Sequence, residues 1–173
     1  MGHWPRRYVQ RQIGPHRKSA RLILWINQGS ALGMAAIAQT LWRHVLRFDP
    51  AKPDWFDRDR FVLSNGHVGI LQYILLHLAG YEKWTMEQLK GYCHPTALDF
   101  TNMSKTHPEI EFDGLDMSTG PLGQGIANAV GMAIANMNLR ATYNTDRSEI
   151  IKARVYCSSG DACLQEGWHW KVR

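Results

Sequence analysis

Three short polar segments of the chain contain residues that could bind an anion or a metal ion. The first is 63–67 (LSNGH), in which His67 stands directly before an apolar run. The first N–H groups of a helix attract anions, so a His at this place could donate a hydrogen bond to a phosphate oxygen. The alternative is a partly buried His whose hydrogen bonds are structural.

The second segment is 118–125 (STGPLGQG), with three glycines and one proline in eight residues. Such a turn is rigid, and its backbone can approach a ligand closely. It matches neither the Walker A nor the dinucleotide fingerprint, and it lacks a phosphate-binding Lys. A ligand-binding loop and a simple tight loop before a helix both fit this pattern.

The third segment is 160–167 (GDACLQEG), which follows a run typical of a strand. Asp161 would then lie at the carboxyl end of that strand, where a Mg²⁺ or Ca²⁺ ion could bridge it to a diphosphate. Backbone N–H groups at the start of the next helix would bind the diphosphate oxygens. The alternative is a turn in which Asp161 caps that helix.

The elements that must position these segments are mostly helical. Apolar residues at three- and four-residue steps predict helices over about 30–46 and 123–143. In the second helix one stripe consists of Ile126, Val130, Ile134 and Met137. Its glycines and alanines would permit close packing on a neighbour.

Two further helices are expected in the first half of the chain. The apolar run 68–78 predicts a buried helix, with Gly80 as a left-handed C-cap. A capping box formed by Thr85 and Gln88 predicts a short helix that ends at Lys90.

The remaining segments are irregular except for one strand. Prolines and alternating charges predict a loop over 48–60, and 91–119 has little periodicity. The run 153–158 (ARVYCS) predicts a buried strand, so helices dominate the first 145 residues and a sheet begins only after them. We therefore expect an α/β protein, a helix-rich amino-terminal portion with the first strand or strands of a parallel sheet.

Composition limits the class of protein. The chain has 173 residues with 45% hydrophobic residues, enough for a core, and a net charge of +5. Residues 1–48 hold eight of the 20 Arg and Lys residues and no Asp or Glu, so the basic character belongs to an amino-terminal leader. Cys93, Cys157 and Cys163 are widely spaced, which fits reduced thiols better than a disulfide framework or a zinc site.

The leader, 1–28, has three possible interpretations: a transit sequence, a nucleic-acid-binding arm, or a poorly ordered segment without function. No apolar run reaches the roughly 18 residues that cross a bilayer, and no secretory signal pattern is present. We expect neither a nucleic-acid partner nor a membrane for the chain as a whole.

The three polar segments, taken in order, resemble the amino-terminal domain of transketolases. The similarity also includes 31–50 (ALGMAAIAQTLWRHVLRFDP), RDRFVLSN before His67, HPE at 107–109 and IANAVGMAIA at 126–135. The sequence of segment 160–167 (GDACLQEG) is most similar to the dihydroxyacetone-synthase-like branch of that family. The resemblance implies a partial thiamine-diphosphate-binding fold over 29–167, followed by a divergent tail, 168–173.

The resemblance also implies roles for individual residues. His67, Gly160 and Ala162 would lie beside the diphosphate of thiamine diphosphate, and Asp161 would bind Mg²⁺. The backbone of Gly120, Pro121 and Leu122 would line the thiamine site, His107 would face the hydroxyls of a sugar donor, and Glu166 would lie near a subunit interface.

The implied activity is the transfer of a two-carbon ketol unit from a ketose to an aldose, in carbohydrate metabolism. The substrates would be sugar phosphates or small ketoses and aldoses, and the family enzyme is a homodimer. We expect a cytoplasmic protein, with peroxisomal or mitochondrial localisation as alternatives.

Several departures from the family pattern bear on that activity. The stretch 27–30 (NQGS) replaces a Gly-His-Pro-Gly, Lys105 and Thr106 replace a Pro-Gly, and Ala162 replaces a glycine. The family's second Mg²⁺ ligand and its pyrimidine-binding domain would lie beyond residue 173. We therefore expect a truncated family member; the alternatives are a catalytically inactive fragment and a protein that binds partners through its basic leader.

Overall fold

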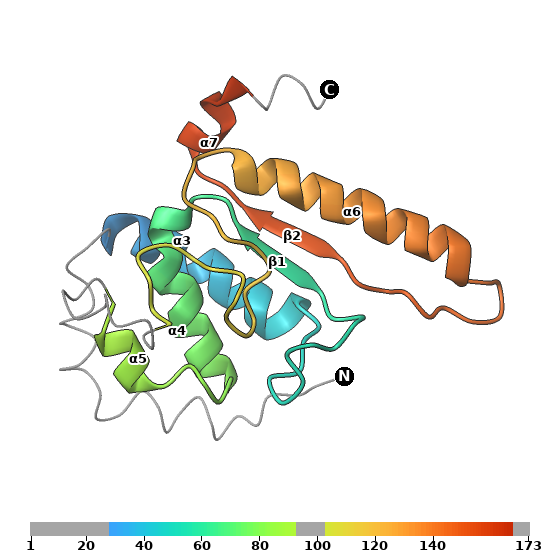
Figure 1. Ribbon diagram of the computed structural model, residues 1–173, viewed down its shortest axis with the longest axis horizontal. Coiled ribbons are helices and arrows are strands. Elements are labelled where there is room, and N and C mark those ends of the chain that lie inside the picture. The colour runs from blue at the N-terminus through green and yellow to red at the C-terminus, as the bar shows by residue number, and fades with distance from the viewer. Residues whose placement is uncertain (1–27, 93–102, 168–173) are drawn as a thin grey trace. The chain divides into compact units, whose positions relative to one another are not determined.

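The computed structural model describes residues 28–92 and 103–167, which fall into two compact units (Figure 1). The described residues of the helical unit are 28–46, 67–92 and 103–106, and those of the sheet unit are 47–66 and 107–167. The predicted leader and tail lie outside the described residues, apart from Gln28.

The helical unit contains the helices predicted for the first half of the chain. Helix α3, Gln28–Thr40, continues into the π-helical turn η1, Leu41–Val45. Helix α4, Gly69–Ala79, and helix α5, Met86–Lys90, follow. Their bounds confirm the helices expected over 30–46, 68–78 and 85–90.

Aromatic side chains form the centre of the helical unit. Tyr73 stacks on Trp84 with ring centroids 4.7 Å apart, and Tyr92 meets Tyr73 edge-on at 6.0 Å. All three rings are buried. The Tyr73 hydroxyl donates a hydrogen bond to the Lys105 carbonyl at 3.0 Å, which joins α4 to segment 103–106. His77 Nδ1 lies 2.6 Å from the Trp84 carbonyl, which joins α4 to the loop that leads to α5.

Local chemistry sets the helix ends as predicted. Gly80 follows α4 with φ of 91°, a left-handed conformation that costs glycine little. At α5 the Thr85 hydroxyl accepts a hydrogen bond from the Gln88 N–H at 3.3 Å. Each cap satisfies backbone groups that the helix itself leaves without a partner.

The sheet unit is built on two parallel strands, β1 (Arg60–Leu63) and β2 (Val155–Ser158). The expectation that no strand precedes residue 153 is wrong. Strand β1 has only four residues and begins with the charged Arg60. This pattern is too short to predict a strand from alternating apolar and polar residues. The α/β class with a parallel sheet is confirmed.

Strand β2 is not the buried strand that its sequence predicts. Cys157 is exposed, and the other three residues are half-buried. Among the described residues β2 pairs with β1 alone, so one of its edges is not covered by another strand.

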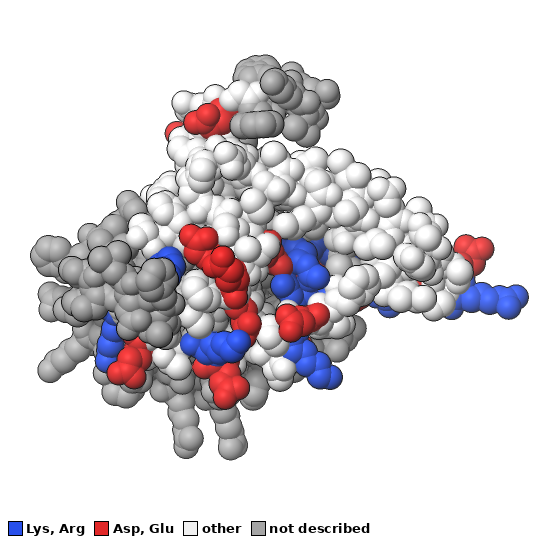
Figure 2. Space-filling view, viewed as in Figure 1, with Lys and Arg blue, Asp and Glu red and all other residues white. Residues whose placement is uncertain are grey.

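Helix α6, Gln124–Tyr143, packs on both strands, and α7, Asp161–Gln165, follows β2 (Figure 1). The buried residues of α6 are Gly125 and Ala129, whereas Ile134 and Met137 of the apolar stripe are 55% and 68% exposed. The small side chains therefore face the strands. The visible surface of α6 carries almost no charge (Figure 2).

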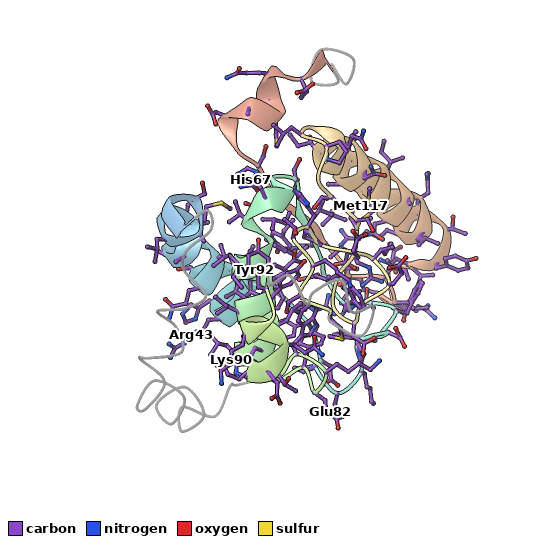
Figure 3. All side chains as sticks on the ribbon, turned by 60° about the vertical axis from the view of Figure 1, so that its left-hand side comes forward. Arg43, His67, Glu82, Lys90, Tyr92 and Met117 are labelled. Atoms are coloured by element: carbon purple, nitrogen blue, oxygen red, sulfur yellow. The ribbon has the colours of Figure 1, made fainter. Side chains whose placement is uncertain are left out.

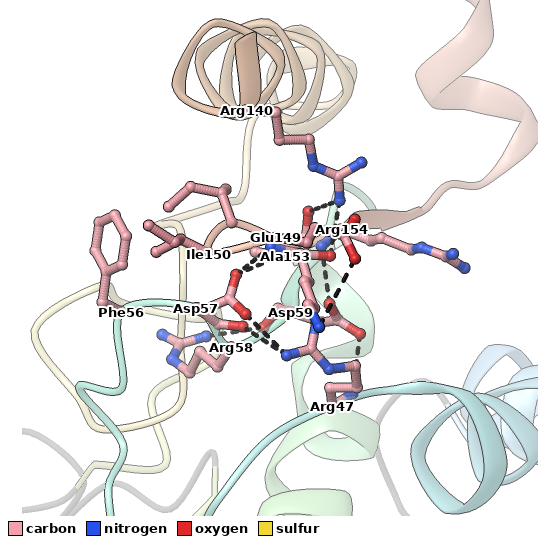
Figure 4. A network of polar contacts seen from close by, with 12 residues as sticks. Arg47, Phe56, Asp57, Arg58, Asp59, Arg140, Glu149, Ile150, Ala153 and Arg154 are labelled. Carbon is pink, nitrogen blue, oxygen red and sulfur yellow. Dashed lines mark hydrogen bonds and ion pairs between the residues drawn. The ribbon is translucent and has the colours of Figure 1, made fainter. Parts of the chain in front are cut away.

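Two aspartates of the 48–60 loop, which leads into β1, bind the segment that leads into β2 (Figure 4). Asp57 Oδ1 accepts the N–H groups of Lys152 and Ala153 at 2.6 and 2.7 Å, and its Oδ2 pairs with Arg47 at 2.9 Å. Asp59 accepts the N–H groups of Arg154 and Arg47 at 2.8 and 2.9 Å. Asp57 and Asp59 of this loop are therefore paired within the fold.

A third carboxylate, Asp116, also holds the start of β1. Its Oδ1 lies 2.7 Å from Arg58 Nη2, and its Oδ2 accepts the Phe61 N–H at 2.9 Å. Arg60 approaches the same carboxylate at 3.5 Å.

Within the described ranges, no helix is both apolar and long enough to span a bilayer.

Candidate functional site

The carboxyl ends of the two strands bring two of the three polar segments to one edge of the sheet. The register pairs Leu63 with Ser158, and the Ser64 N–H donates to the Ser158 carbonyl at 2.8 Å. The residues that follow each strand therefore start side by side. In parallel sheets this edge is where ligands usually bind.

The glycine-rich segment 118–125 lies against the segment that follows β1. An ideal Cβ on Gly66 would lie 2.8 Å from Thr119 Oγ1 and 2.9 Å from the Gly120 nitrogen. Any side chain at Gly66 would push these backbones apart. The close approach thus explains why 66 is a glycine.

His107 lies beside Gly120 in the same unit. An ideal Cβ on Gly120 would lie 3.5 Å from the His107 ring, an ordinary contact distance. The Thr119 N–H donates to the Pro108 carbonyl at 3.1 Å, and the Ser118 hydroxyl accepts the Ile110 N–H at 2.9 Å. These bonds tie 107–110 to 118–120 and fix the half-buried His107 against Gly120.

Gly123 and Gly125 join the glycine-rich segment to the other two. Gly123 has φ of 80°, and an ideal Cβ there would lie 2.8 Å from Glu166 Cβ. An ideal Cβ on Gly125 would lie 2.5 Å from Ser64 Cα. The three polar segments therefore converge at one end of the strand pair.

The turn between β2 and α7 carries the residues predicted to bind a diphosphate and Mg²⁺. An ideal Cβ on Gly160 would lie 3.8 Å from Asn65 Cβ, Ala162 is half-buried and Asp161 is exposed at the start of α7. In the part of the chain that the structure describes, no three His, Cys, Asp or Glu side chains gather as a metal cluster. Mg²⁺ commonly uses only one or two carboxylates together with phosphate oxygens and water, so Asp161 fits that role.

The glycine-rich loop also fits a bound organic group. The Thr119 side chain is buried, and its hydroxyl has no hydrogen-bond partner among residues 28–92 and 103–167. Pro121 is exposed and Leu122 is half-buried beside it. A buried hydroxyl without a partner is costly unless a ligand or water satisfies it.

His67 belongs to the helical unit. It lies in the 3₁₀ turn η2, Gly66–Val68, directly before α4 (Figure 3), and it is half-buried. Its expected place at the start of a helix is confirmed. Its predicted role at a diphosphate stays a prediction.

Two residues that sequence reasoning missed are Ser64 and Cys163. Both are almost completely buried, with exposed fractions of 0% and 1%. Burial opposes ionisation of the Cys163 thiol, but nearby hydroxyl and N–H groups outweigh it and hold the pKa below its ordinary value. The only sequence signal was the position of each residue inside a polar segment.

Comparisons with known proteins agree on one family. Residues 27–172 match the family model described as "Transketolase, thiamine diphosphate binding domain". The dihydroxyacetone synthase of Pichia angusta is 55% identical over 139 residues, which are 80% of this chain and 19% of that protein. Transketolase 1 of Escherichia coli K12 is 48% identical over 140 residues, 80% of this chain and 20% of that protein.

A solved structure gives the same result. The transketolase of Leishmania mexicana superposes with a TM-score of 0.78 and 44% sequence identity, covering 86% of this chain and 22% of that one. The chain spans about a fifth of the length of the curated relatives it matches. Motif order, fold and both kinds of similarity lead to one conclusion: the chain belongs to the transketolase family and corresponds to its thiamine diphosphate binding domain.

Proposed function

We propose that the chain supplies the diphosphate-binding side of a thiamine diphosphate site in a transketolase-type enzyme. The enzyme would transfer a two-carbon ketol unit from a ketose, such as a sugar phosphate, to an aldose. One observation carries the proposal: three polar segments far apart in the sequence meet at the carboxyl ends of β1 and β2. That edge is the usual ligand site of a parallel sheet.

The proposed roles divide the site between diphosphate and thiamine. Gly160, Ala162 and His67 would contact the diphosphate, and Asp161 would hold Mg²⁺ against it. Peptide N–H groups bind phosphate oxygens without a side chain, which suits the small residues on either side of Asp161.

The thiamine side would rest on the glycine-rich loop. The backbone of Gly120, Pro121 and Leu122 would line the ring system, and the orphan hydroxyl of Thr119 is the polar group beside it. When bound, thiamine diphosphate supplies the carbanion-stabilising chemistry that ketol transfer needs. The chain's own residues would bind and orient the reactants.

His107 would act on the substrate side. Its ring is fixed against Gly120 by the bonds that tie 107–110 to 118–120. From that place it would donate hydrogen bonds to hydroxyls of the sugar donor and hold the donor near the cofactor. Glu166, beside Gly123, would contribute to a homodimer interface.

Equilibrium binding tests the proposal. Thiamine diphosphate with Mg²⁺ is titrated into the chain, and we expect weak, saturable binding with a Kd on the order of 1 mM, because these residues would form one side of the site. Asp161→Asn should abolish it, and Asp146→Asn, a change of another exposed carboxylate in the sheet unit, should not. Equal binding by the two variants would exclude Asp161 from the site.

A catalytically inactive chain is the alternative. It predicts no ketol transfer from xylulose 5-phosphate to ribose 5-phosphate in a coupled assay, even at saturating cofactor. Measurable transfer that is lost in His107→Ala would decide for an active enzyme.

A further inference from the structure

Two tyrosine hydroxyls hold consecutive carbonyl groups at the end of segment 103–106. The Tyr73 hydroxyl donates a hydrogen bond to the Lys105 carbonyl at 3.0 Å. The Tyr92 hydroxyl donates one to the Thr106 carbonyl at 3.2 Å. All four residues belong to the helical unit, of which Thr106 is the last residue. The segment is neither helix nor strand, so these side chains anchor its backbone.

Packing fixes the two tyrosines themselves. Tyr73 is fully buried and stacks on Trp84, and Tyr92 is 8% exposed and meets Tyr73 edge-on. A buried Tyr usually finds a partner for its hydroxyl, because an unpaired hydroxyl is costly to bury. Here both hydroxyls have a main-chain carbonyl as partner, and the aromatic cluster sets where each hydroxyl can reach.

A third anchor holds the start of the segment. Gln88 Oε1 accepts the N–H of the buried Met103 at 2.8 Å. The Lys105 N–H donates to the Met103 carbonyl at 2.8 Å, which closes a tight turn between the two ends. Segment 103–106 contains no proline that would restrain its backbone by itself. Its restraint therefore comes from the three side chains.

His107 follows this segment directly and is restrained from its other side as well. Pro108 limits the residue before it to extended backbone conformations. The Pro108 carbonyl accepts the Thr119 N–H at 3.1 Å within the sheet unit. The main chain is thus anchored both immediately before and immediately after His107.

We propose that Tyr73 and Tyr92 are positioning residues for the His107 ring. Their hydroxyls hold the two carbonyls that precede His107, and Gln88 holds the start of the same segment. The consequence for a sugar donor rests on the function proposed above; the consequence for the ring does not. The competing interpretation is that the hydroxyls only stabilise the helical unit.

Tyr92→Phe and Tyr73→Phe each remove one hydroxyl and keep the aromatic ring. The readout is the ring signal of His107 in an NMR spectrum of the ¹³C- and ¹⁵N-labelled chain without ligand, assigned with His107→Gln. A positioning role predicts that this signal moves and broadens in both variants. The exchange rate of the Lys105 N–H should also rise about fivefold, because the turn that it closes opens more often.

Two controls separate positioning from a loss of stability. Tyr143→Phe removes the hydroxyl of an exposed tyrosine and should leave the His107 signal unchanged. Gly80→Ala strains the left-handed cap of α4 in the same unit, so it lowers stability and should also leave the signal unchanged. Equal changes in Gly80→Ala and Tyr92→Phe would overturn the proposal, and so would an unchanged signal in both Tyr→Phe variants that lose a carbonyl contact.

Gln88 provides an independent test should the tyrosine variants fold poorly. Gln88→Met removes the acceptor of the Met103 N–H, whereas Gln88→Glu keeps an oxygen there. In Gln88→Met the exchange rate of the Met103 N–H should rise about fivefold and the His107 signal should move. Gln88→Glu should restore both. A His107 signal that stays in place in Gln88→Met would contradict the proposal.

A titration with xylulose 5-phosphate, in the presence of thiamine diphosphate and Mg²⁺, measures the consequence for the site. The His107 signal should move saturably, and Tyr92→Phe should raise the Kd about fivefold. Absence of any movement in the unsubstituted chain would count against the proposed function alone, because the effect of the hydroxyls on the ring is measured without ligand.

Discussion

Gly125 and Gly131 stand in the same helix, α6, but their surroundings are opposite. An ideal Cβ on Gly125 would lie 2.5 Å from backbone, whereas one on Gly131 would meet nothing within 4 Å. Glycine in a helix interior costs roughly 0.5–1 kcal/mol relative to alanine. Only at Gly125 does packing outweigh that cost.

Alanine at the two positions should therefore have opposite effects. Gly125→Ala should lower the free energy of unfolding by about 1–3 kcal/mol through overpacking against Ser64. Gly131→Ala should raise it by about 0.5–1 kcal/mol. Urea denaturation followed by circular dichroism measures both, and effects of the same sign would contradict the packing described for α6.

Asp57 provides a test in the pH dependence of stability. Partial burial opposes its ionisation, but the hydrogen bond from Arg47 and those from the Lys152 and Ala153 N–H groups outweigh this, so its pKa is held below the ordinary value. A carboxylate with a lowered pKa stabilises the fold above its unfolded pKa, near pH 4, and that contribution disappears as the pH falls through the folded pKa.

Asp57→Asn should thus lower the free energy of unfolding by about 1–2 kcal/mol at pH 7. The difference from the unsubstituted chain should shrink as the pH falls below about 4. Asp54→Asn, in an exposed position of the same loop, is the control and should change the free energy by less than about 0.5 kcal/mol. A difference for Asp57→Asn that is constant from pH 7 to pH 3 would show that the ionised carboxylate is not what stabilises the loop.

The sequence identified the three polar segments that the structure brings together, but not the contacts that hold them there. Gly120 and Asp161 stand in short motifs that can be read locally. Asp57 could not be assigned, because its partners at 152–153 are distant in the sequence. Only the folded chain brings those groups together.

At the scale of elements, the helices were predictable because their signals are local. The Thr85 hydroxyl caps α5 as its capping box predicts. Thr85→Ala should lower the free energy of unfolding by about 0.5–2 kcal/mol, whereas Thr85→Ser should keep most of it. Thermal unfolding of the two variants measures the cap, and equal losses would show that the hydroxyl contributes nothing.

The strands were predicted less well, for a physical reason. Strand β1 has only four residues, and its charged first residue, Arg60, pairs with Asp116 across the fold. Strand β2 was expected to be buried from its apolar composition, but burial depends on neighbours that a sequence does not specify. Pairing between β1 and β2 is a contact between residues 95 positions apart.

The burial of the apolar stripe of α6 also depends on neighbours that the sequence does not specify. Periodicity identified the helix correctly, but it could not tell which face packs on the strands. The face with Gly125 and Ala129 does, because small side chains allow closer approach than Ile134 or Met137. The glycines and alanines of α6 predicted close packing on a neighbour, and Gly125 and Ala129 pack closely on the strands.

At the scale of the whole molecule, the family was accessible from the order and spacing of four motifs. Composition alone would not have reached it, since a net charge of +5 comes largely from the amino-terminal leader. The relatives are about five times longer than the matched segment. The site proposed for this chain is formed by three of its own segments.

An NMR titration of the ¹⁵N-labelled chain with thiamine diphosphate and Mg²⁺ tests whether the three segments form a single binding site. The amides of Gly120, Gly160 and Ala162 should shift together with one common midpoint, and Asp161→Asn should remove the shifts while Asp146→Asn keeps them. Shifts that appear in one segment only, or that survive Asp161→Asn, would contradict a single site at the carboxyl ends of β1 and β2.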